Sequence, residues 1–125
     1  MSAKHVLVVD DDEAILAIVA QLLQPLDLTV VTVHSGAECL QKLQEGFHGL
    51  ILMDVYMPKM NGWETIEAMV SQGLCDGNII IMCTGLQVPT PSMDALKSYV
   101  VDYITKPFDV VEFVDIIEMY LSYLG

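Results

Sequence analysis

The sequence predicts a doubly wound α/β fold, in which five βα units build a five-stranded parallel sheet with helices on both faces. Short runs of apolar, often β-branched residues alternate along the chain with segments of helical periodicity. Each apolar run is continuous, which is typical of a strand covered on both faces. This alternation requires right-handed crossovers between parallel strands. Because no linker or repeat interrupts it, we expect one domain over residues 1–125.

The first βα unit opens with a strand predicted at residues 6–9, where four apolar residues follow one another. Apolar side chains at helical spacing come next, over residues 15–23, and Pro25 ends this helix. A second apolar, β-branched run at residues 28–33 predicts the second strand.

The second helix is expected to begin at Ser35, with Glu38 three residues later. This spacing is that of a capping box, in which the serine oxygen accepts from a backbone N–H and the glutamate reaches back to the serine N–H. Leu40 and Leu43 supply the buried face of the helix, and Gly46 ends it.

The third and fourth strands are predicted at residues 50–53 and 79–83, and the latter is the most hydrophobic run of the chain. Between them, Asn61 is expected to cap a helix, with Glu64 reaching back to it. The inward face of that helix consists of Trp63, Ile66, Met69 and Val70.

The fifth unit has shorter elements. A short helix is predicted at residues 92–99 and a brief strand at residues 103–105. Asp109 and Glu112 are expected to cap the last helix. The apolar residues that share its buried face are Phe113, Ile116, Ile117, Tyr120, Leu121 and Leu124.

Charge and composition limit the partners. Seventeen acids against five bases give a formal net charge of −12. Nucleic acids and anionic membranes need a cationic face, so neither is an expected partner. No stretch approaches the roughly 18 apolar residues of a membrane span, and no signal peptide opens the chain.

Cys39, Cys75 and Cys83 lack disulfide or metal-ligand spacing, so we expect reduced thiols in a cytoplasmic protein.

Polar residues follow four of the predicted strands at the points where the strands end. They are Asp10, Asp11 and Asp12 after the first strand, Asp54 after the third, Thr84 after the fourth and Lys106 after the fifth. Open α/β sheets bind ligands beyond the carboxyl ends of their strands. The sequence therefore predicts that these side chains converge on one edge of the sheet.

A group of carboxylates at that edge requires a counter-ion. Two unit charges at 4 Å repel by about 4 kcal/mol at an effective dielectric near 20. Oxygen ligands without histidine or cysteine favour a hard cation, Mg²⁺ before Ca²⁺ or Zn²⁺. Lys106 supplies a second positive charge for a phosphate that such a cation would share, and Thr84 a hydroxyl donor.

Each of these residues also has a simpler interpretation. Residues 10–12 suit the start of a helix, where acids complement the dipole. Asp54 then only ends a strand, Thr84 occupies a turn and Lys106 is a surface lysine. The coincidence of all of them at the correct strand ends favours a functional site.

The ordered motifs resemble those of the response-regulator receiver domains of two-component signalling. They are VVDDD at residues 8–12, MDVYMP at 53–58, NG at 61–62, TG at 84–85 and DYITKPF at 102–108. Together they span nearly the whole chain. The resemblance implies the flavodoxin-like strand order 2-1-3-4-5.

By this resemblance, Asp54 is the phosphoacceptor. It would take a phosphoryl group from a sensor histidine kinase or a phosphotransfer protein, giving 4-aspartylphosphate. Asp11 would bind Mg²⁺ directly and Asp10 directly or through water, together with Asp54 and the backbone carbonyl of Tyr56. Asp12 matches a position that is not a ligand. The resemblance implies no enzyme beyond catalysis of the domain's own phosphorylation and dephosphorylation.

The resemblance also implies a conformational switch. The hydroxyl of Thr84 would move toward the phosphoryl group, and Tyr103 would rotate into the space behind it. This would reorganise the surface of the fourth helix, fifth strand and last helix, which would control a downstream effector protein. The alternative for Tyr103 is an edge-strand aromatic with a solvated hydroxyl. The Lys106–Pro107 bond is expected to be cis.

Three departures from the family pattern carry expectations. Tyr99 stands where the family has the glycine that ends the fourth helix, so we expect a distorted helix end. Pro89 and Pro91 are expected to shorten the start of that helix. Tyr56 and Leu86 carry no group that orients an attacking water, which predicts slow self-dephosphorylation.

Other functions remain as alternatives. A phosphorylation-independent receiver that only contacts proteins would not need the full set of acids, threonine and lysine. An aspartate-nucleophile phosphatase usually has a second acid two residues after the nucleophile, where this chain has Tyr56. A flavin mononucleotide carrier needs a glycine- and hydroxyl-rich loop where this chain has acids. We expect a stand-alone receiver or a piece of a longer protein.

Overall fold

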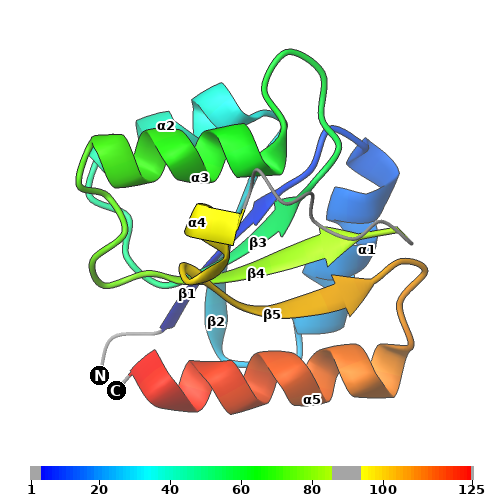
Figure 1. Cartoon of the computed structure of the whole chain (residues 1–125). Coiled ribbons are helices and arrows are strands. Elements are labelled where there is room, and N and C mark those ends of the chain that lie inside the picture. Colours follow the sequence, from blue (N-terminus) through cyan, green and yellow to red (C-terminus); the bar gives the residue numbers. More distant parts are fainter. Residues whose placement is uncertain (1–3, 86–93, 125) are drawn as a thin grey trace.

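A computed structural model describes residues 4–85 and 94–124, which form a five-stranded parallel sheet in the order β2-β1-β3-β4-β5. The strands are β1 (Lys4–Val9), β2 (Leu28–Val33), β3 (Leu50–Asp54), β4 (Ile79–Thr84) and β5 (Val100–Thr105). The helices are α1 (Glu13–Leu23), α2 (Gly36–Gln44), α3 (Gly62–Ser71), α4 (Asp94–Lys97) and α5 (Val110–Leu121), with a final 3₁₀ turn at Ser122–Leu124. The predicted fold class and strand order are confirmed (Figure 1).

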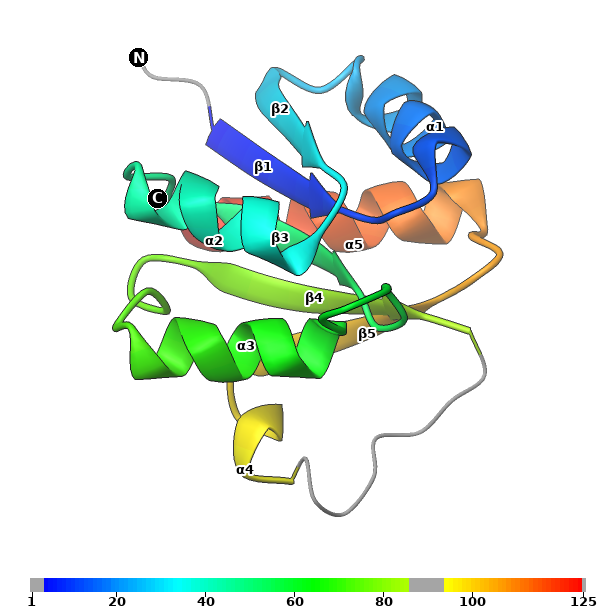
Figure 2. The same cartoon turned by 90° about the horizontal axis from the view of Figure 1, so that it is seen from above.

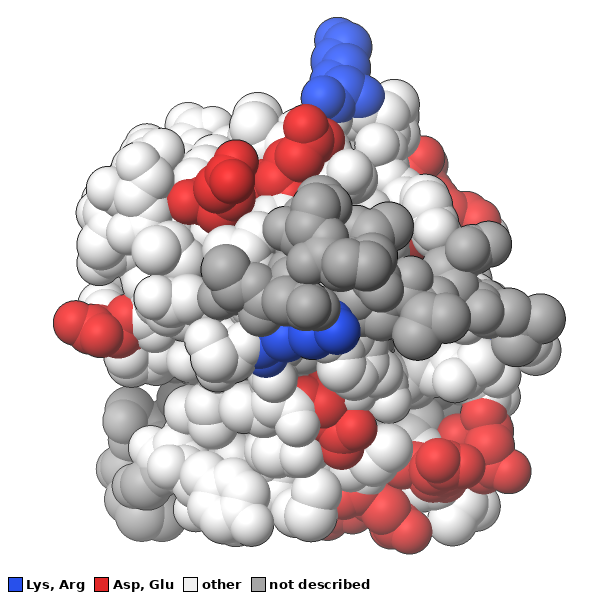
Figure 3. Space-filling view, in the orientation of Figure 1, with Lys and Arg blue, Asp and Glu red and all other residues white. Residues whose placement is uncertain are grey.

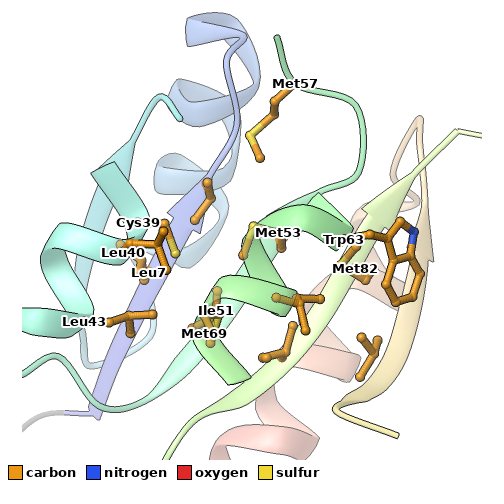
Figure 4. Packing of buried hydrophobic residues seen from close by; sticks show 14 of the residues in the cluster. Leu7, Cys39, Leu40, Leu43, Ile51, Met53, Met57, Trp63, Met69 and Met82 are labelled. Carbon is orange, nitrogen blue, oxygen red and sulfur yellow. The ribbon is translucent and has the colours of Figure 1, made fainter. Parts of the chain in front are cut away.

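Helices cover both faces of the sheet, and each face has its own hydrophobic core. Helices α2 and α3 lie on one face, and α1 and α5 lie on the other (Figure 2). Alternate residues of β1 divide between the two cores, because successive side chains of a strand point to opposite faces. Leu7 points toward Cys39 and Leu40 of α2 (Figure 4), whereas Val8 packs in the core formed with α1 and α5.

Burial in these cores explains the continuous apolar runs. All five residues of β3, Leu50 to Asp54, are buried. Fully burying a leucine or isoleucine contributes about 1.5–3 kcal/mol relative to exposure, so the central strands supply much of the stability of the domain. Cys39 and Cys83 are buried and Cys75 is half-buried, and all three are free thiols. Burial raises the pKa of Cys39 and of Cys83 to about 12.

Side-chain caps fix where the helices begin. The predicted capping box of α3 is complete: Asn61 Oδ1 accepts from the Glu64 N–H at 2.8 Å, and Glu64 Oε1 accepts from the Asn61 N–H at 2.9 Å. At α2 the predicted box is only half formed. Ser35 Oγ accepts from the Glu38 N–H, but Glu38 accepts from the backbone N–H of His34, one residue before the cap.

Strand β5 is longer than the sequence predicted, because Val100 and Asp102 also pair with β4. The prediction began the strand at Tyr103, since the mixed polar and apolar residues before it do not read as a buried run. The β4–β5 register shifts between Ile80 and Ile81, and this irregularity lies within the part of β5 that the pattern missed.

Helix α4 ends earlier than predicted, at Lys97 instead of Tyr99. Tyr99 lies in a turn, where its N–H donates to the Leu96 carbonyl at 3.1 Å before β5 begins. The early start of β5 therefore ends the helix. Pro89 and Pro91 lie outside the described residues. None of the helices within residues 4–85 and 94–124 is long and apolar enough to cross a bilayer.

Candidate functional site

Three acids meet at the carboxyl edge of the sheet. Asp10 follows β1 and Asp54 ends β3, and these strands are neighbours whose register pairs Val9 with Met53. Carboxylate oxygens of Asp10, Asp11 and Asp54 all lie within 4.8 Å of one another, and we call these residues the acidic cluster. Asp10 is 3% exposed and Asp54 6% exposed, whereas Asp11 faces solvent. The carboxylates of Asp10 and Asp54 are thus largely shielded from solvent.

Lys106 brings a positive charge to the acidic cluster from the end of β5. Its Nζ donates to Asp10 Oδ2 at 2.7 Å and to Asp54 Oδ1 at 3.1 Å. The Lys106 N–H donates to the Thr84 carbonyl at 2.7 Å, which fixes the backbone beside β4. The Lys106–Pro107 bond is cis, as predicted. Residues that are 96 and 52 positions apart in sequence therefore form one ion-pair network.

Asp12 has a different role from its two neighbours. It is the N-cap of α1, and its Oδ1 accepts from the Ala14 N–H at 2.9 Å. Its own N–H donates to Asp10 Oδ1 at 2.9 Å. The interpretation as a helix start is therefore correct for Asp12, whereas the acidic cluster contains Asp10 and Asp11.

The surroundings of Asp54 raise its pKa above the ordinary value of an aspartate. Its pKa is raised from 3.8 to about 6. Burial is the largest cause of this rise, and the nearby charge of Asp10 is the second. The charge and hydrogen bond of Lys106 act in the opposite direction, as does a hydrogen bond from the Tyr56 N–H. The pKa of Lys106 is raised, because its hydrogen bond to Asp10 and the charges of both acids outweigh the effect of burial. One lysine thus leaves the acids under-neutralised.

Without divalent cations, Asp54→Asn is expected to stabilise the protein above pH 6. Because folding raises the Asp54 pKa, its contribution to stability is present below about pH 4 and is lost as the pH rises through about 6. The amide cannot ionise, so the variant should gain about 1–2 kcal/mol at pH 8 and little at pH 4. Urea unfolding in EDTA at both pH values measures this difference. Asp27→Asn, at an exposed acid, is the control, and a variant less stable than wild type at pH 8 contradicts the prediction.

Thr84 carries an unsatisfied hydroxyl at the same edge. It ends β4, beside the position where Cys83 pairs with Asp54. Its Oγ1 is buried and has no hydrogen-bond partner among the described residues. A buried polar group without a hydrogen-bond partner lowers the stability of the fold by about 1–3 kcal/mol. An acceptor group bound at this edge of the sheet would therefore gain a hydrogen bond from the Thr84 hydroxyl.

Tyr103 and Tyr56, the two aromatic residues assigned by resemblance, are both exposed. The Tyr103 ring lies on β5 with its centroid 6.4 Å from that of Trp63, and the planes are tilted by 44°. This position agrees with the interpretation of Tyr103 as an edge-strand aromatic. The Tyr56 N–H donates to the Asp54 carboxylate, which places the backbone of residue 56 beside the acidic cluster.

Gly62 belongs to the NG motif at residues 61–62, but the sequence analysis gave it no role at the site. Its N–H donates to the Val55 carbonyl at 2.8 Å. A Cβ at this position would lie 2.5 Å from the backbone oxygen of Asp54 and 2.9 Å from Met82 Cε. Only glycine lets α3 begin against the end of β3. The signal available in the sequence was a glycine directly after the Asn61 cap.

Gly62→Ala is expected to destabilise the protein by about 2–3 kcal/mol, because the clash is with backbone that cannot move without displacing Asp54. Gly73→Ala is the matched control. Gly73 has a φ of +70° with nothing near its Cβ position. An alanine there therefore costs only the backbone strain of a side chain at positive φ, about 1 kcal/mol. Urea unfolding measures the free energy of unfolding of both variants. Equal losses of stability would show that a Cβ at residue 62 fits beside the Asp54 backbone.

The sequence matches known proteins over most of its length. Residues 6–118 match the family described as "Response regulator receiver domain". The alkaline phosphatase synthesis transcriptional regulatory protein PhoP of Bacillus subtilis is 33% identical over 105 residues, which cover 84% of this chain and 43% of that protein. The sensor histidine kinase CheAY of Helicobacter pylori is 31% identical over 82% of this chain and 13% of that protein. The chain thus spans less than half of each of these relatives.

Solved structures show the same architecture. A CheY-like response regulator receiver domain protein from Methanospirillum hungatei superposes with a TM-score of 0.91 at 36% identity, covering 97% of this chain and 96% of that one. The chemotaxis protein CheY4 of Vibrio cholerae superposes with a TM-score of 0.81 at 29% identity, covering 96% of this chain and all of that one.

Proposed function

The chain belongs to the response regulator receiver domain family, and from this premise we propose that it is a phosphoacceptor switch of a two-component system. Residues 1–125 would form one receiver domain, with Asp54 as the acceptor. The observation that carries the proposal is the geometry around Asp54: a buried carboxylate in the acidic cluster, 3.1 Å from the Lys106 ammonium. The protein would act on no substrate other than its own phosphoryl group.

The proposed reaction is phosphoryl transfer from a phosphohistidine. A carboxylate oxygen of Asp54 attacks the phosphorus, and an O–P bond forms as the P–N bond breaks. The electron pair leaves with the imidazole, which takes up a proton, and the product is an acyl phosphate on Asp54. Lys106 is placed to neutralise charge on the transferred group, and Thr84 to donate its free hydroxyl to a phosphoryl oxygen. The attack requires ionised Asp54, which its pKa of about 6 permits at neutral pH.

The donor set of the acidic cluster fits Mg²⁺. Carboxylates of Asp10, Asp11 and Asp54 offer only oxygen ligands, and the backbone of Tyr56 lies beside them. Mg²⁺ prefers such ligands and retains several waters. We propose that these three acids and the Tyr56 carbonyl hold it. When bound, the ion neutralises charge at the acids and on the phosphoryl oxygens.

An apolar groove adjoins Lys106 and suits a protein donor. It has a volume of about 210 Å³ and lies between α1 and the segment that leads into α5. Its lining includes Ile15, Ile18, Phe108 and Val110 beside Lys106. We propose that the sensor histidine kinase or phosphotransfer protein packs against this groove while its phosphohistidine reaches Asp54. Both events would take place in the cytoplasm.

Phosphorylation is proposed to switch the surface of α4, β5 and α5. Thr84 would move toward the phosphoryl group, and Tyr103 would rotate inward behind it, away from its exposed position. Tyr103 contacts Trp63 on α3, so its rotation would change the surroundings of that indole. The altered surface would then control a downstream effector. Slow self-dephosphorylation stays a prediction, because Leu86 lies outside the described residues.

Phosphorylation is expected to change the fluorescence of Trp63, the only tryptophan of the chain. The indole is buried against Tyr103, so moving that ring changes its contacts and its quenching. Emission spectra before and after addition of acetyl phosphate with Mg²⁺ measure the change. Tyr103→Ala should remove most of it, whereas Tyr123→Phe, away from Trp63, should keep it. An identical response in Tyr103→Ala would contradict the proposed rotation.

The experiment that tests the proposed function is intact mass after incubation with acetyl phosphate and Mg²⁺. Acetyl phosphate can replace the protein donor, because the chemistry lies in the acceptor site. A gain of one phosphoryl group that disappears in excess EDTA supports the proposal. Labelling that does not need a metal would favour another function, and absence of labelling would favour an interaction module that works without phosphorylation.

A further inference from the structure

Strand β2 forms one edge of the sheet. It pairs with β1 and with no other strand of the described residues (Figure 2). The Asp10 N–H donates to the Val33 carbonyl at 3.2 Å, so the backbone groups of Val33 face β1. Because successive residues of a strand direct their N–H and C=O groups to opposite sides, Val31 also faces β1, whereas Val30 and Thr32 face outward. The outer edge of β2 therefore presents unpaired backbone donors and acceptors.

The outer edge of β2 lacks the features that usually protect an edge strand, which are charged side chains, prolines and bulges. Its six residues, Leu28–Val33, are only leucine, threonine and valine, and they pair with Lys4–Val9 without a break in register. Strand β5, at the opposite edge, carries Asp102 and has a register shift against β4 between Ile80 and Ile81. One edge of this sheet is thus protected against an added strand, and the other is open to it.

Side chains on both faces of β2 can pack against an added strand. Val31 packs in part against the core with α2 and α3, and Val30 against the core with α1 and α5. Thr29 and Thr32, on either side of them, are exposed. Cross-strand pairs that include β-branched side chains contribute roughly 0.2–1 kcal/mol each relative to alanine pairs. An added strand rich in such residues would therefore extend both cores as well as pair its backbone.

Acidic side chains lie at both ends of β2. The exposed Asp27 directly precedes the strand. Beyond its other end, Glu13 and Glu38 lie 3.1 Å and 3.5 Å from the ring of His34. One imidazole cannot neutralise two carboxylates, even when it is protonated. Lys4 of β1 directs its Nζ to a carbonyl of α5, at 2.6 Å. Both ends of the edge therefore attract positive charge.

The charge of the whole chain selects among the possible occupants of this edge. A second copy would bring a net charge of −12 against the same charge. Acidic side chains are spread over the face drawn in Figure 3, with basic ones at few places, so this charge is not confined to one corner. An extended segment of another protein, with basic residues at its ends, fits both the open backbone edge and the acids that flank it.

We propose that the outer edge of β2 binds an extended, cationic segment of another protein by strand addition. The segment exchanges backbone hydrogen bonds with Val30 and Thr32 and places β-branched side chains beside those of β2. Its terminal lysine or arginine residues face Asp27 at one end and Glu38 at the other. Binding should weaken with rising salt, because these ion pairs are exposed and screened. It requires no phosphoryl group, since the edge does not include Asp54.

The test is binding of labelled peptides to the full chain, followed by fluorescence anisotropy. The probe has alternating valine and threonine residues with a pair of lysines at each end. One control peptide has glutamates in place of the lysines, and another has methylated amides in its central part, so that its backbone cannot pair. We expect the probe to bind and both controls to bind about tenfold more weakly or not at all.

Hydrogen exchange of the wild-type chain locates the bound peptide. The amides of Val30 and Thr32 should exchange about tenfold more slowly with the probe than without it, whereas that of Val31, already bonded to β1, should change little. Thr32→Pro removes an outward N–H and keeps the bonds to β1, so it should weaken binding about tenfold or more. The matched control Thr32→Ser keeps the N–H and should bind like the wild type. Circular dichroism shows whether each variant is folded.

Several outcomes would overturn the inference. Absence of binding, or equal binding of the probe and the methylated peptide, shows that β2 does not add a strand. Unchanged exchange at Val30 and Thr32 places the peptide elsewhere, and this result does not depend on whether Thr32→Pro folds. Self-association that a folded Thr32→Pro abolishes identifies a second copy as the occupant and also overturns the inference. No step uses a phosphoryl donor, so these results are independent of the phosphoacceptor proposal.

Discussion

Asp54→Asn is expected to accept no phosphoryl group from acetyl phosphate under conditions in which the wild type is labelled. The amide carries no negative charge and is a poor nucleophile, and the structure offers Asp54 as the buried acid that contacts Lys106 at the end of β3. Intact mass measures the loss. Release of the wild-type label by hydroxylamine would identify it as an acyl phosphate.

The matched control for this variant is Asp12→Asn. Asp12 lies two residues from Asp10 but caps α1, and asparagine is an equally good N-cap. Its labelling should therefore equal that of the wild type. Labelling that persists in Asp54→Asn, or that disappears in Asp12→Asn, would place the acceptor elsewhere among the acids.

Lys106→Met is expected to lower the stability of the metal-free protein by about 2–4 kcal/mol at pH 8. The substitution leaves Asp10 and Asp54, which are both buried, without their cation. Lys106 acts to lower the pKa of Asp54, so its removal raises that pKa above about 6. The penalty should shrink as the pH falls and Asp54 takes up a proton. Urea unfolding in EDTA from pH 8 to pH 4 measures it.

Two further variants show whether this loss comes from the buried acids. Lys42→Met removes a surface lysine that lies 3.8 Å from Glu45, and should cost less than about 1 kcal/mol. The double variant Lys106→Met with Asp54→Asn should recover much of the stability, because only one buried carboxylate then remains. A loss that is independent of pH, or a double variant as unstable as Lys106→Met, would mean that packing of the lysine stem dominates.

The fold could be predicted because its strands are buried on both faces. Runs such as residues 6–9 and 79–83 are apolar throughout, and no other common element combines that pattern with short helical segments between the runs. The errors fall where burial is partial. Residues 100–102 alternate between buried and exposed at the sheet edge, so the start of β5 and the end of α4 could not be located from hydrophobicity.

The position of the candidate site could be predicted from the sheet topology, but the pKa values and contacts of its residues could not. The carboxyl ends of parallel strands share one edge, so Asp10, Asp54 and Lys106 could be placed together from their strands alone. The raised pKa of Asp54 depends on how much water reaches it, which sequence does not encode locally. The same holds for the unpartnered Thr84 hydroxyl, and for Gly62, whose close approach to β3 is a tertiary contact.

Local competition explains the remaining error. The spacing of Ser35 and Glu38 fits a capping box, but the glutamate bonds to the backbone N–H of His34. The His34 ring also lies 3.5 Å from Glu38 and 3.1 Å from Glu13 of α1, so the histidine directly before the cap takes the glutamate. The four-residue pattern from Ser35 to Glu38 does not include His34, so it could not show this competition.

The most direct measurement is an anomalous difference map from crystals grown with Mn²⁺, a hard cation that can replace Mg²⁺ at oxygen ligands. We expect a peak at the carboxyl edge of the sheet, at a coordination distance of about 2.2 Å from carboxylate oxygens of Asp11 and Asp54 and close to Asp10. An ordered Mn²⁺ bound only elsewhere on this acidic surface, with the Asp54 carboxylate still paired to Lys106 alone, would contradict a cation site in the acidic cluster.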